Sequence, residues 1–170
     1  MDLAGHTIWV VDDDAILRRA LGRLLRARGF NVELFSEGGQ FLQSLALRRP
    51  HCVILDVNLG QASGLDLLQH PQVRALQLPV IMITGNEDPA IREQAKAGGA
   101  IELLLKPFEE RLLMTAVCAA LEKNQSERTM ADVLPGLAKY TAGQDSEMRA
   151  PQPEKAPHPY PLPIGSREGE

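Results

Sequence analysis

Cysteine is scarce in this chain, and long apolar runs are missing. Cys52 and Cys118 are the two cysteines among 170 residues, and both lie in apolar stretches, so buried free thiols are expected rather than a disulfide framework. No stretch approaches the roughly 20 apolar residues of a membrane span, and residues 1–6 lack the basic region and apolar run of a signal peptide. A cytoplasmic protein that does not contact the membrane is the expectation.

An excess of positive charge is lacking as well. The formal net charge is −4 and the isoelectric point is about 5.6. Neither a nucleic-acid-binding surface nor a membrane-binding surface is therefore indicated. Hydrophobic residues make up 44% of the chain, which is enough for one domain of ordinary size with a real core.

Short apolar runs alternate with stretches of helical periodicity. Strands are expected at residues 6–11, 31–35, 52–56, 80–83 and 101–105, and helices at residues 15–28, 38–47, 64–70, 89–97 and 109–123. Such alternation predicts an α/β fold, a doubly wound five-stranded parallel sheet with helices on both faces. The nearly continuous apolar character of the strands fits burial on both sides.

The character of the sequence changes after Lys123. Residues 1–123 are expected to form the folded domain, and residues 124–170 a linker-like, proline-rich tail that is disordered. A weak helix over residues 130–140 would be interrupted by Pro135 and Gly136. The tail carries five basic and seven acidic residues and no periodic basic helices, so a DNA-binding output domain is not expected.

Polar side chains follow four of the predicted strands. Asp12–Asp14 follow the first strand, Asp56 ends the third, Thr84 ends the fourth and Lys106 follows the fifth. The carboxyl ends of parallel strands meet at one edge of the sheet, and carboxylates crowded there need a cation such as Mg²⁺. A lysine and a hydroxyl beside them suit a phosphoryl group, so the set predicts phosphoryl transfer through an acyl-phosphate on Asp56.

Each part of this set has an ordinary structural explanation. An acidic triplet after a strand is commonly a turn with a helix cap, and Asp14 is placed to cap the helix that follows. A Thr-Gly pair is usually a turn and a Lys-Pro pair usually a loop. The functional interpretation depends on the occurrence of all the parts, in order, at one edge of one sheet.

The chain resembles the receiver domain of two-component response regulators. The residues of its motifs are most similar to those in the receivers of nitrogen-fixation-type regulators. The resemblance covers about residues 5–123. The residues that carry it are Val11-Asp12-Asp13, Leu55-Asp56-Val57-Asn58 with Ser63-Gly64, Ile83-Thr84-Gly85 and Leu105-Lys106-Pro107-Phe108. It implies a flavodoxin-like strand order, 2-1-3-4-5. Nitrogen-fixation-type regulators carry a C-terminal helix-turn-helix, and because residues 124–170 lack its basic, periodic helices, a single-domain regulator without a DNA-binding output domain is expected.

The resemblance also assigns the metal ligands. Asp56 is the implied phosphorylation site. Asp13, Asp56 and the backbone carbonyl of Asn58 are the implied ligands of Mg²⁺, and Asp12 assists from outside the direct ligand set.

Thr84 and Lys106 are the residues implied to contact the phosphoryl group, and the Lys106–Pro107 peptide is expected to be cis. The implied donor is a sensor histidine kinase or a histidine phosphotransfer protein. Movement of Thr84 is then expected to switch the face formed by the helix at 89–97 and the strand at 101–105. That face would bind a downstream protein not identified by the sequence, and by analogy could form a homodimer on phosphorylation.

Two positions depart from the family pattern. Gly60 stands where the family often has proline, and Leu103 where it often has the aromatic residue that reorients with the hydroxyl. Gly60 is expected to loosen its loop, and Leu103 removes the aromatic part of the switch. Asn58 and Asn86 are expected to flank the path of the water that hydrolyses the acyl-phosphate.

Three other classes of protein remain as alternatives. A metal-dependent phosphatase with an aspartate nucleophile typically has a second acid two residues later, where this chain has Asn58. A flavodoxin-like cofactor binder would need a phosphate loop after the first strand, where Asp12–Asp14 would repel phosphate. A pseudo-receiver that only docks partners would not need the intact acid, hydroxyl and lysine.

We expect a phosphoacceptor rather than an enzyme. Its chemistry would be limited to its own phosphorylation and dephosphorylation.

Overall fold

The computed structural model describes the backbone of residues 5–144 and the side chains of residues 5–130. The predicted disordered tail began at residue 124, and its part from residue 145 onward lies outside the described residues. The chain divides into two compact units, Met1–Ala131 and Asp132–Glu170. Apart from the end of the last helix, the features below belong to the first unit.

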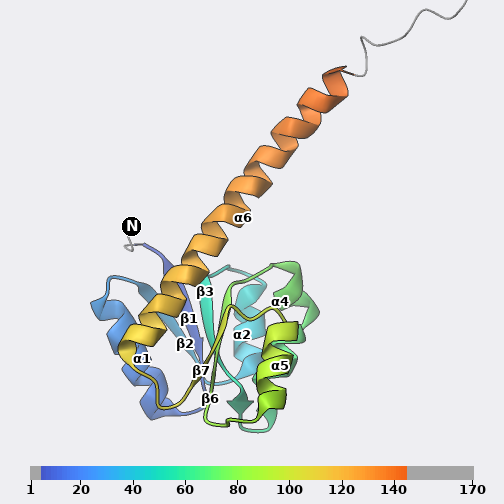
Figure 1. Ribbon diagram of the computed structural model, residues 1–170. Helices are drawn as coiled ribbons and strands as arrows, with labels where there is room; N and C mark the ends of the chain where they lie inside the picture. Colours follow the sequence, from blue (N-terminus) through green and yellow to red (C-terminus); the bar gives the residue numbers. More distant parts are fainter. Residues whose placement is uncertain (1–4, 145–170) are drawn as a thin grey trace, which may run out of the picture. The chain divides into compact units, whose positions relative to one another are not determined.

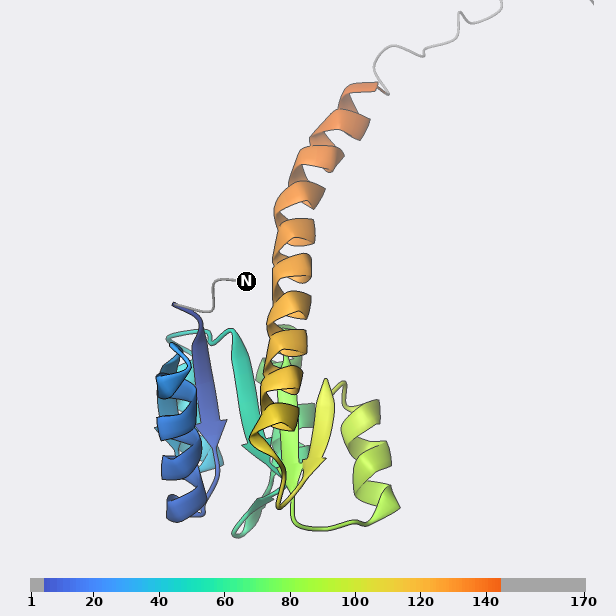
Figure 2. The same ribbon diagram turned by 60° about the vertical axis from the view of Figure 1, so that its left-hand side comes forward.

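A five-stranded parallel sheet forms the centre of this unit (Figures 1 and 2). Its order is β2-β1-β3-β6-β7, which confirms the predicted topology, and its strands are β1 (Thr7–Val11), β2 (Asn31–Phe35), β3 (Cys52–Asp56), β6 (Val80–Thr84) and β7 (Glu102–Leu105). A small antiparallel hairpin of β4 (Asn58–Leu59) and β5 (Ala62–Ser63) was not predicted.

Helices cover both faces of the sheet, as predicted. They are α1 (Ala15–Ala27), α2 (Gly38–Leu45), α3 (Gly64–Gln69), α4 (Pro71–Ala75), α5 (Pro89–Ala97) and α6 (Glu110–Gln144). Within the described residues, no helix combines the length and the apolar character that a membrane crossing requires.

Successive strand residues point to opposite faces and build two separate cores. On one face, Ile54 belongs to a cluster that includes Leu25 of α1 and Val117 of α6. On the other, Leu55 belongs to a cluster that includes Phe41 of α2. All five residues of β3 and all five of β6 are buried, which explains why these strands read as continuous apolar runs.

The ends of α1 follow from local chemistry. The Asp14 carboxylate accepts hydrogen bonds from the backbone N–H groups of Ile16 (2.9 Å) and Leu17 (3.2 Å), so it caps the helix as predicted. Gly29, just beyond the helix, has a φ of +91°, a conformation that favours glycine.

Helix α6 is longer than predicted. The sequence placed its end near Lys123 and an interruption at Pro135 and Gly136, but the helix runs to Gln144. The prediction was wrong because it followed apolar periodicity alone. Residues 122–128 are mostly good helix formers, so the helix can continue through them. Asn124 is buried although it is polar, and it occupies a position where the periodicity requires an apolar residue.

At each edge of the sheet, one charged side chain occupies a backbone group. At the β2 edge, Arg26 Nη2 donates a hydrogen bond to the carbonyl of Val32 (3.1 Å). At the β7 edge, the Glu102 carboxylate accepts one from the N–H of Leu103 (3.1 Å). Backbone groups that are occupied in this way do not offer a template to another strand.

His51 joins the starts of two neighbouring strands. Its Nδ1 accepts a hydrogen bond from the backbone N–H of Thr7 (3.0 Å), and its ring meets His6 edge-on with centroids 5.0 Å apart. Burial, followed by the nearby charges of Arg128, His6 and Arg49, lowers the pKa of His51 below its ordinary value. Protonation would remove the acceptor, so the fold favours the neutral ring.

We predict that His51 makes the protein less stable in acid. The lowered pKa means that the unfolded chain binds a proton more readily, so the free energy of unfolding should fall as the pH drops below about 6.5. His51→Asn keeps an acceptor oxygen near the position of Nδ1 but does not titrate. Urea unfolding of both proteins at pH 8 and pH 5 should show a smaller loss for the variant; equal losses would contradict the prediction.

Candidate functional site

Four strands deliver the predicted site residues to the same edge of the sheet. Asp12 directly follows β1, Asp56 ends β3 and Thr84 ends β6, while Lys106 directly follows β7. Asp12 and Asp56 have exposed fractions of 0% and 3%, and Thr84 of 3%. Two buried acids at adjacent strand ends need compensation.

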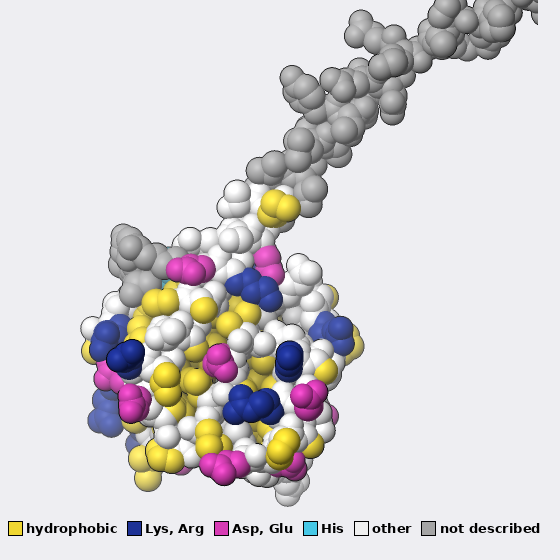
Figure 3. All heavy atoms as spheres, viewed as in Figure 1, with side chains coloured by type: hydrophobic (Ala, Val, Ile, Leu, Met, Phe, Trp, Pro, Cys, Tyr) yellow, Lys and Arg dark blue, Asp and Glu magenta, His cyan; other side chains and the backbone are white. Residues whose placement is uncertain are grey.

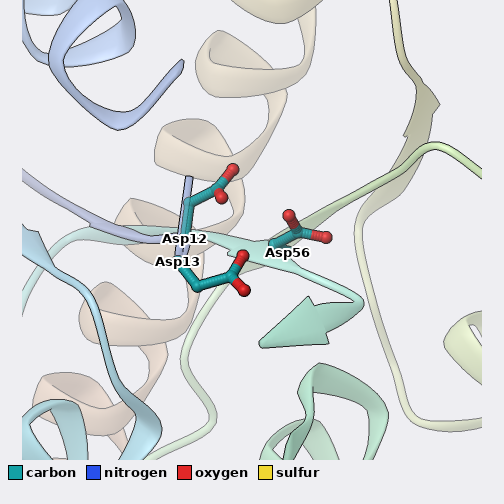
Figure 4. Close-up of side chains that lie close together, drawn as sticks. All are labelled: Asp12, Asp13 and Asp56. Carbon is teal, nitrogen blue, oxygen red and sulfur yellow. The ribbon is translucent and has the colours of Figure 1, made fainter. Parts of the chain in front are cut away.

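The three predicted acids form one cluster. Asp12, Asp13 and Asp56 each offer a carboxylate oxygen, and these oxygens lie within 4.8 Å of one another. In Figure 4 the Asp13 carboxylate reaches from the end of β1 toward Asp56. Asp13 is exposed, so the cluster has a buried side and an open side. Hard oxygen donors at this spacing fit Mg²⁺, which takes a few carboxylates and keeps water in its other positions.

Backbone N–H groups fix two of these carboxylates. The N–H of Asn58 donates to Asp56 Oδ1 (2.9 Å), and the N–H of Asp14 donates to Asp12 Oδ1 (2.8 Å). Asn58 is exposed at the start of β4. Its carbonyl as a metal ligand stays a prediction.

Lys106 provides the counter-charge within the protein. Its Nζ lies 2.6 Å from Asp56 Oδ2 and 3.3 Å from Asp12 Oδ2. Burial alone lowers the pKa of Lys106, but the hydrogen bond to Asp56 and the charges of both carboxylates outweigh burial and raise it. The ammonium group is therefore charged at neutral pH and sits between the two buried acids.

The site disfavours the anionic form of Asp12. Burial raises the pKa of Asp12 to about 6, and the negative charge of Asp56 also raises it. The hydrogen bond from the Asp14 N–H and the nearby Lys106 ammonium group act in the opposite direction and lower the pKa. The carbonyl of Asp12 accepts a hydrogen bond from Arg18 Nη1 (2.6 Å). No pattern in the sequence predicts this contact.

Thr84 and Lys106 are held in register by the sheet. The N–H of Lys106 donates to the Thr84 carbonyl (2.7 Å), and the Lys106–Pro107 peptide is cis, as predicted. The Thr84 hydroxyl oxygen accepts a hydrogen bond from the N–H of Asn86 (3.1 Å). Thr84 also lines a hollow of about 220 Å³ together with Leu103, which was not predicted from the sequence.

A hollow of about 750 Å³ lies elsewhere, between Arg28 and the outer face of α6. None of the predicted site residues lines it. The acid cluster, rather than the volume of a cavity, therefore locates the functional site.

Two glycines shape the chain after Asp56. A Cβ on Gly64 would lie 1.9 Å from the Asp56 carbonyl oxygen, so the chain returns against its own backbone at this point. Gly60 has a φ of +68°, which proline cannot adopt. The chain therefore has glycine, rather than the proline that is frequent in the family, at a position whose backbone conformation excludes proline.

We predict that Gly64→Ala destabilises the protein by about 3 kcal/mol, because its methyl group would overlap backbone atoms that cannot move independently of Asp56. Gly39→Ala is the matched control, since a Cβ there meets nothing within 4 Å and the residue lies in α2. That control should gain about 0.5–1 kcal/mol. Chemical denaturation measures both, and similar values for the two variants would contradict the prediction.

We also predict that Mg²⁺ binds more weakly as the pH falls through about 6, because the ion must displace a proton from Asp12. Asp12→Asn should weaken binding about tenfold at pH 7.5 and should flatten the dependence between pH 7.5 and 5.5. Isothermal titration calorimetry measures both effects, with Asp66→Asn, an exposed acid on α3, as the control. An unchanged pH dependence in Asp12→Asn would contradict the assignment.

Comparisons with known proteins agree with this geometry. The sequence profile of the response regulator receiver domain matches residues 8–118. Nodulation protein W of Bradyrhizobium diazoefficiens is 36% identical over 76% of this chain and 62% of its own length. The transcriptional regulatory protein FixJ of the same organism is 32% identical over 81% of this chain and 69% of its own length. The match thus spans less than two thirds of nodulation protein W.

A solved structure shows the same likeness. A response regulator receiver protein from Burkholderia phymatum is 40% identical, with a TM-score of 0.60 over 69% of this chain and 95% of that one. Receiver domains are phosphorylated by histidine kinases, and Mg²⁺ binding at the acidic cluster is typical of them. On its sequence, its sheet order and its cluster of acids beside a lysine, the chain belongs to the response regulator receiver domain family.

Proposed function

We propose that Asp56 accepts a phosphoryl group from a sensor histidine kinase or a histidine phosphotransfer protein, in two-component phosphorelay signalling. The 2.6 Å contact between Asp56 Oδ2 and Lys106 Nζ, inside the acid cluster, carries the proposal. An Asp56 carboxylate oxygen forms the new bond to phosphorus while the bond from phosphorus to the donor imidazole nitrogen breaks. The bonding electrons stay on that nitrogen, and an acyl-phosphate results.

The side chains around Asp56 have separate roles in this step. The Asn58 N–H orients the carboxylate, and Lys106 moves its charge from the carboxylate to a phosphoryl oxygen. Mg²⁺ would be held by Asp13, Asp56 and the Asn58 carbonyl, with Asp12 nearby. The ion would offset the negative charges of the phosphoryl group and the Asp56 carboxylate as they approach each other. The Thr84 hydroxyl donates a hydrogen bond to a phosphoryl oxygen.

The response starts from Thr84. Its hydroxyl oxygen now accepts the Asn86 N–H, so turning toward the phosphoryl group releases the loop that leads into α5. The face of α5 and β7 changes in consequence, and there a downstream protein or a second copy of the chain binds. Leu103 lines the hollow beside Thr84, where no aromatic ring takes part in the motion.

In this proposal the receiver domain works in the cytoplasm, where response regulators typically occur. Residues after Lys123 carry more acids than bases, which disfavours direct contact with nucleic acid. The chain acts on no separate substrate: its chemistry is the gain and loss of its own phosphoryl group. Partner binding is then the output.

Incubation with Mg²⁺ and acetyl phosphate, followed by intact mass measurement, tests the proposal. We expect one added phosphoryl group on the wild-type chain, none on Asp56→Asn, and one on the control Asp66→Asn. Lys106→Ala should slow the reaction about 100-fold, because it removes a charge that stabilises the transferring group. A wild-type chain that binds Mg²⁺ without gaining a phosphoryl group would instead be a pseudo-receiver that only docks partners.

A further inference from the structure

Arg18 differs from the other arginines of α1. Arg19, Arg23 and Arg26 are exposed, and basic side chains are visible on the surface over α1 at the left of Figure 3. Arg18 is half-buried instead, and its Nη1 donates a hydrogen bond to the backbone carbonyl of Asp12 at 2.6 Å. This distance is short, as is usual for a bond from a charged donor. Arg18 is therefore a fixed part of the edge of the sheet where the acid cluster lies.

The geometry of α1 explains how Arg18 reaches Asp12. The backbone N–H of Arg18 donates to the carbonyl of the capping residue Asp14 (2.9 Å), so Arg18 lies one turn after the start of the helix. Side chains of a helix lean toward its N-terminus, and the guanidinium group therefore extends back to the end of β1. The helix dipole does not favour a cation near this end. The contact with Asp12, rather than the helix itself, accounts for the position of the charge.

The carbonyl that Arg18 binds belongs to the peptide group between Asp12 and Asp13. Because a peptide group is planar, a fixed carbonyl also fixes the direction in which the chain enters Asp13. The N–H of Asp12 is held as well, by the carbonyl of Phe35 (3.1 Å), and Asp12 Oδ1 accepts the N–H of Asp14 (2.8 Å). Together these hydrogen bonds leave the backbone in front of Asp13 little freedom.

Asp13 is the acid of the cluster whose own side chain has the least support. Asp12 and Asp56 each accept a backbone hydrogen bond and pair with Lys106. Among the residues whose side chains are described, none forms a hydrogen bond or an ion pair with the exposed Asp13 carboxylate. Its direction toward Asp56 in Figure 4 therefore depends on the backbone that carries it.

Arg18 does not neutralise the acids. Lys106 forms the ion pairs of Asp12 and Asp56, and in the described part of the chain Arg18 forms none. A cation near the cluster repels Mg²⁺, so its charge alone would make Arg18 unfavourable for metal binding. Its hydrogen bond also satisfies a buried carbonyl, which would affect stability but not the affinity for the ion. A third role, in the geometry of the cluster, predicts a different result from either of these.

We propose that Arg18 is a positioning residue of the Mg²⁺ site. By holding the Asp12 carbonyl, it keeps the Asp13 carboxylate directed toward Asp56, so that the two acids can bind the ion together. This inference rests on the proposed function, in which Asp13 and Asp56 are ligands of Mg²⁺. Arg18 contacts neither the ion nor the phosphoryl group. Ligands that are already in place bind a metal more tightly, because less conformational freedom is lost on binding.

Isothermal titration calorimetry with Mg²⁺ tests the proposal. Arg18→Met should weaken binding about tenfold, although it removes a positive charge from beside the acids. Arg18→Lys keeps a charged donor and should stay within about threefold of the wild type. The matched control is Arg19→Met, which removes the same charge from the exposed neighbouring residue and should leave the affinity within about twofold of the wild type.

The Mg²⁺ dependence of phosphorylation by acetyl phosphate gives a second measurement. In Arg18→Met, the Mg²⁺ concentration that gives half the maximal rate should rise about tenfold, while the rate at saturating Mg²⁺ should stay within about twofold of the wild type. A residue that contacted the phosphoryl group would lower the saturating rate instead.

A further control separates the site from the stability of the fold. Val117 is fully buried in α6, and Val117→Ala should lower the urea concentration at the midpoint of unfolding. Its affinity for Mg²⁺ should nevertheless equal that of the wild type.

The proposal is overturned if Arg18→Met binds Mg²⁺ as tightly as the wild type or more tightly, the result that charge alone predicts. It is also overturned if Arg18→Lys binds no better than Arg18→Met, or if Val117→Ala weakens binding as much as Arg18→Met. A wild-type chain that neither binds Mg²⁺ nor gains a phosphoryl group would remove the proposed function itself. The two failures are therefore distinguishable.

Discussion

The ion pair between Asp56 and Lys106 is the contact on which the site depends. Asp56 ends β3 and Lys106 follows β7, two strands that are not neighbours, so the pair forms only if β6 lies between them in a parallel sheet. Two buried carboxylates at adjacent strand ends would repel each other strongly without this cation. The ammonium group of Lys106 balances the charges of Asp56 and Asp12 together. It lies close enough to Asp56 to contact an oxygen of a phosphoryl group bound there.

Much of this arrangement could be predicted, because parallel strands impose strict rules. Apolar runs that end in Asp12, Asp56 and Thr84 placed those residues at one edge, and the observed sheet order confirms the predicted one. The end of α6 could not be predicted from periodicity, since Asn124 is buried where an apolar residue was expected. The β4–β5 hairpin is two residues per strand, too short to leave an alternating pattern.

Other parts of the site were not predictable for a different reason. The N–H groups that hold Asp12 and Asp56 belong to the backbone, and their direction depends on turns that side-chain patterns do not encode. The same is true of Gly64, whose missing Cβ leaves room for the Asp56 carbonyl. The hollow beside Leu103 is the space that remains after packing, so it follows from the fold as a whole.

The covered edges of the sheet have a consequence for how the protein can associate. With Arg26 bonded to the Val32 carbonyl and Glu102 to the Leu103 N–H, a second chain cannot extend the sheet without first displacing a charged side chain. Association through helix side chains remains open, and such contacts separate without breaking a ladder of backbone hydrogen bonds. The occupied edges therefore disfavour the lasting, fibre-forming association that unprotected strand edges allow.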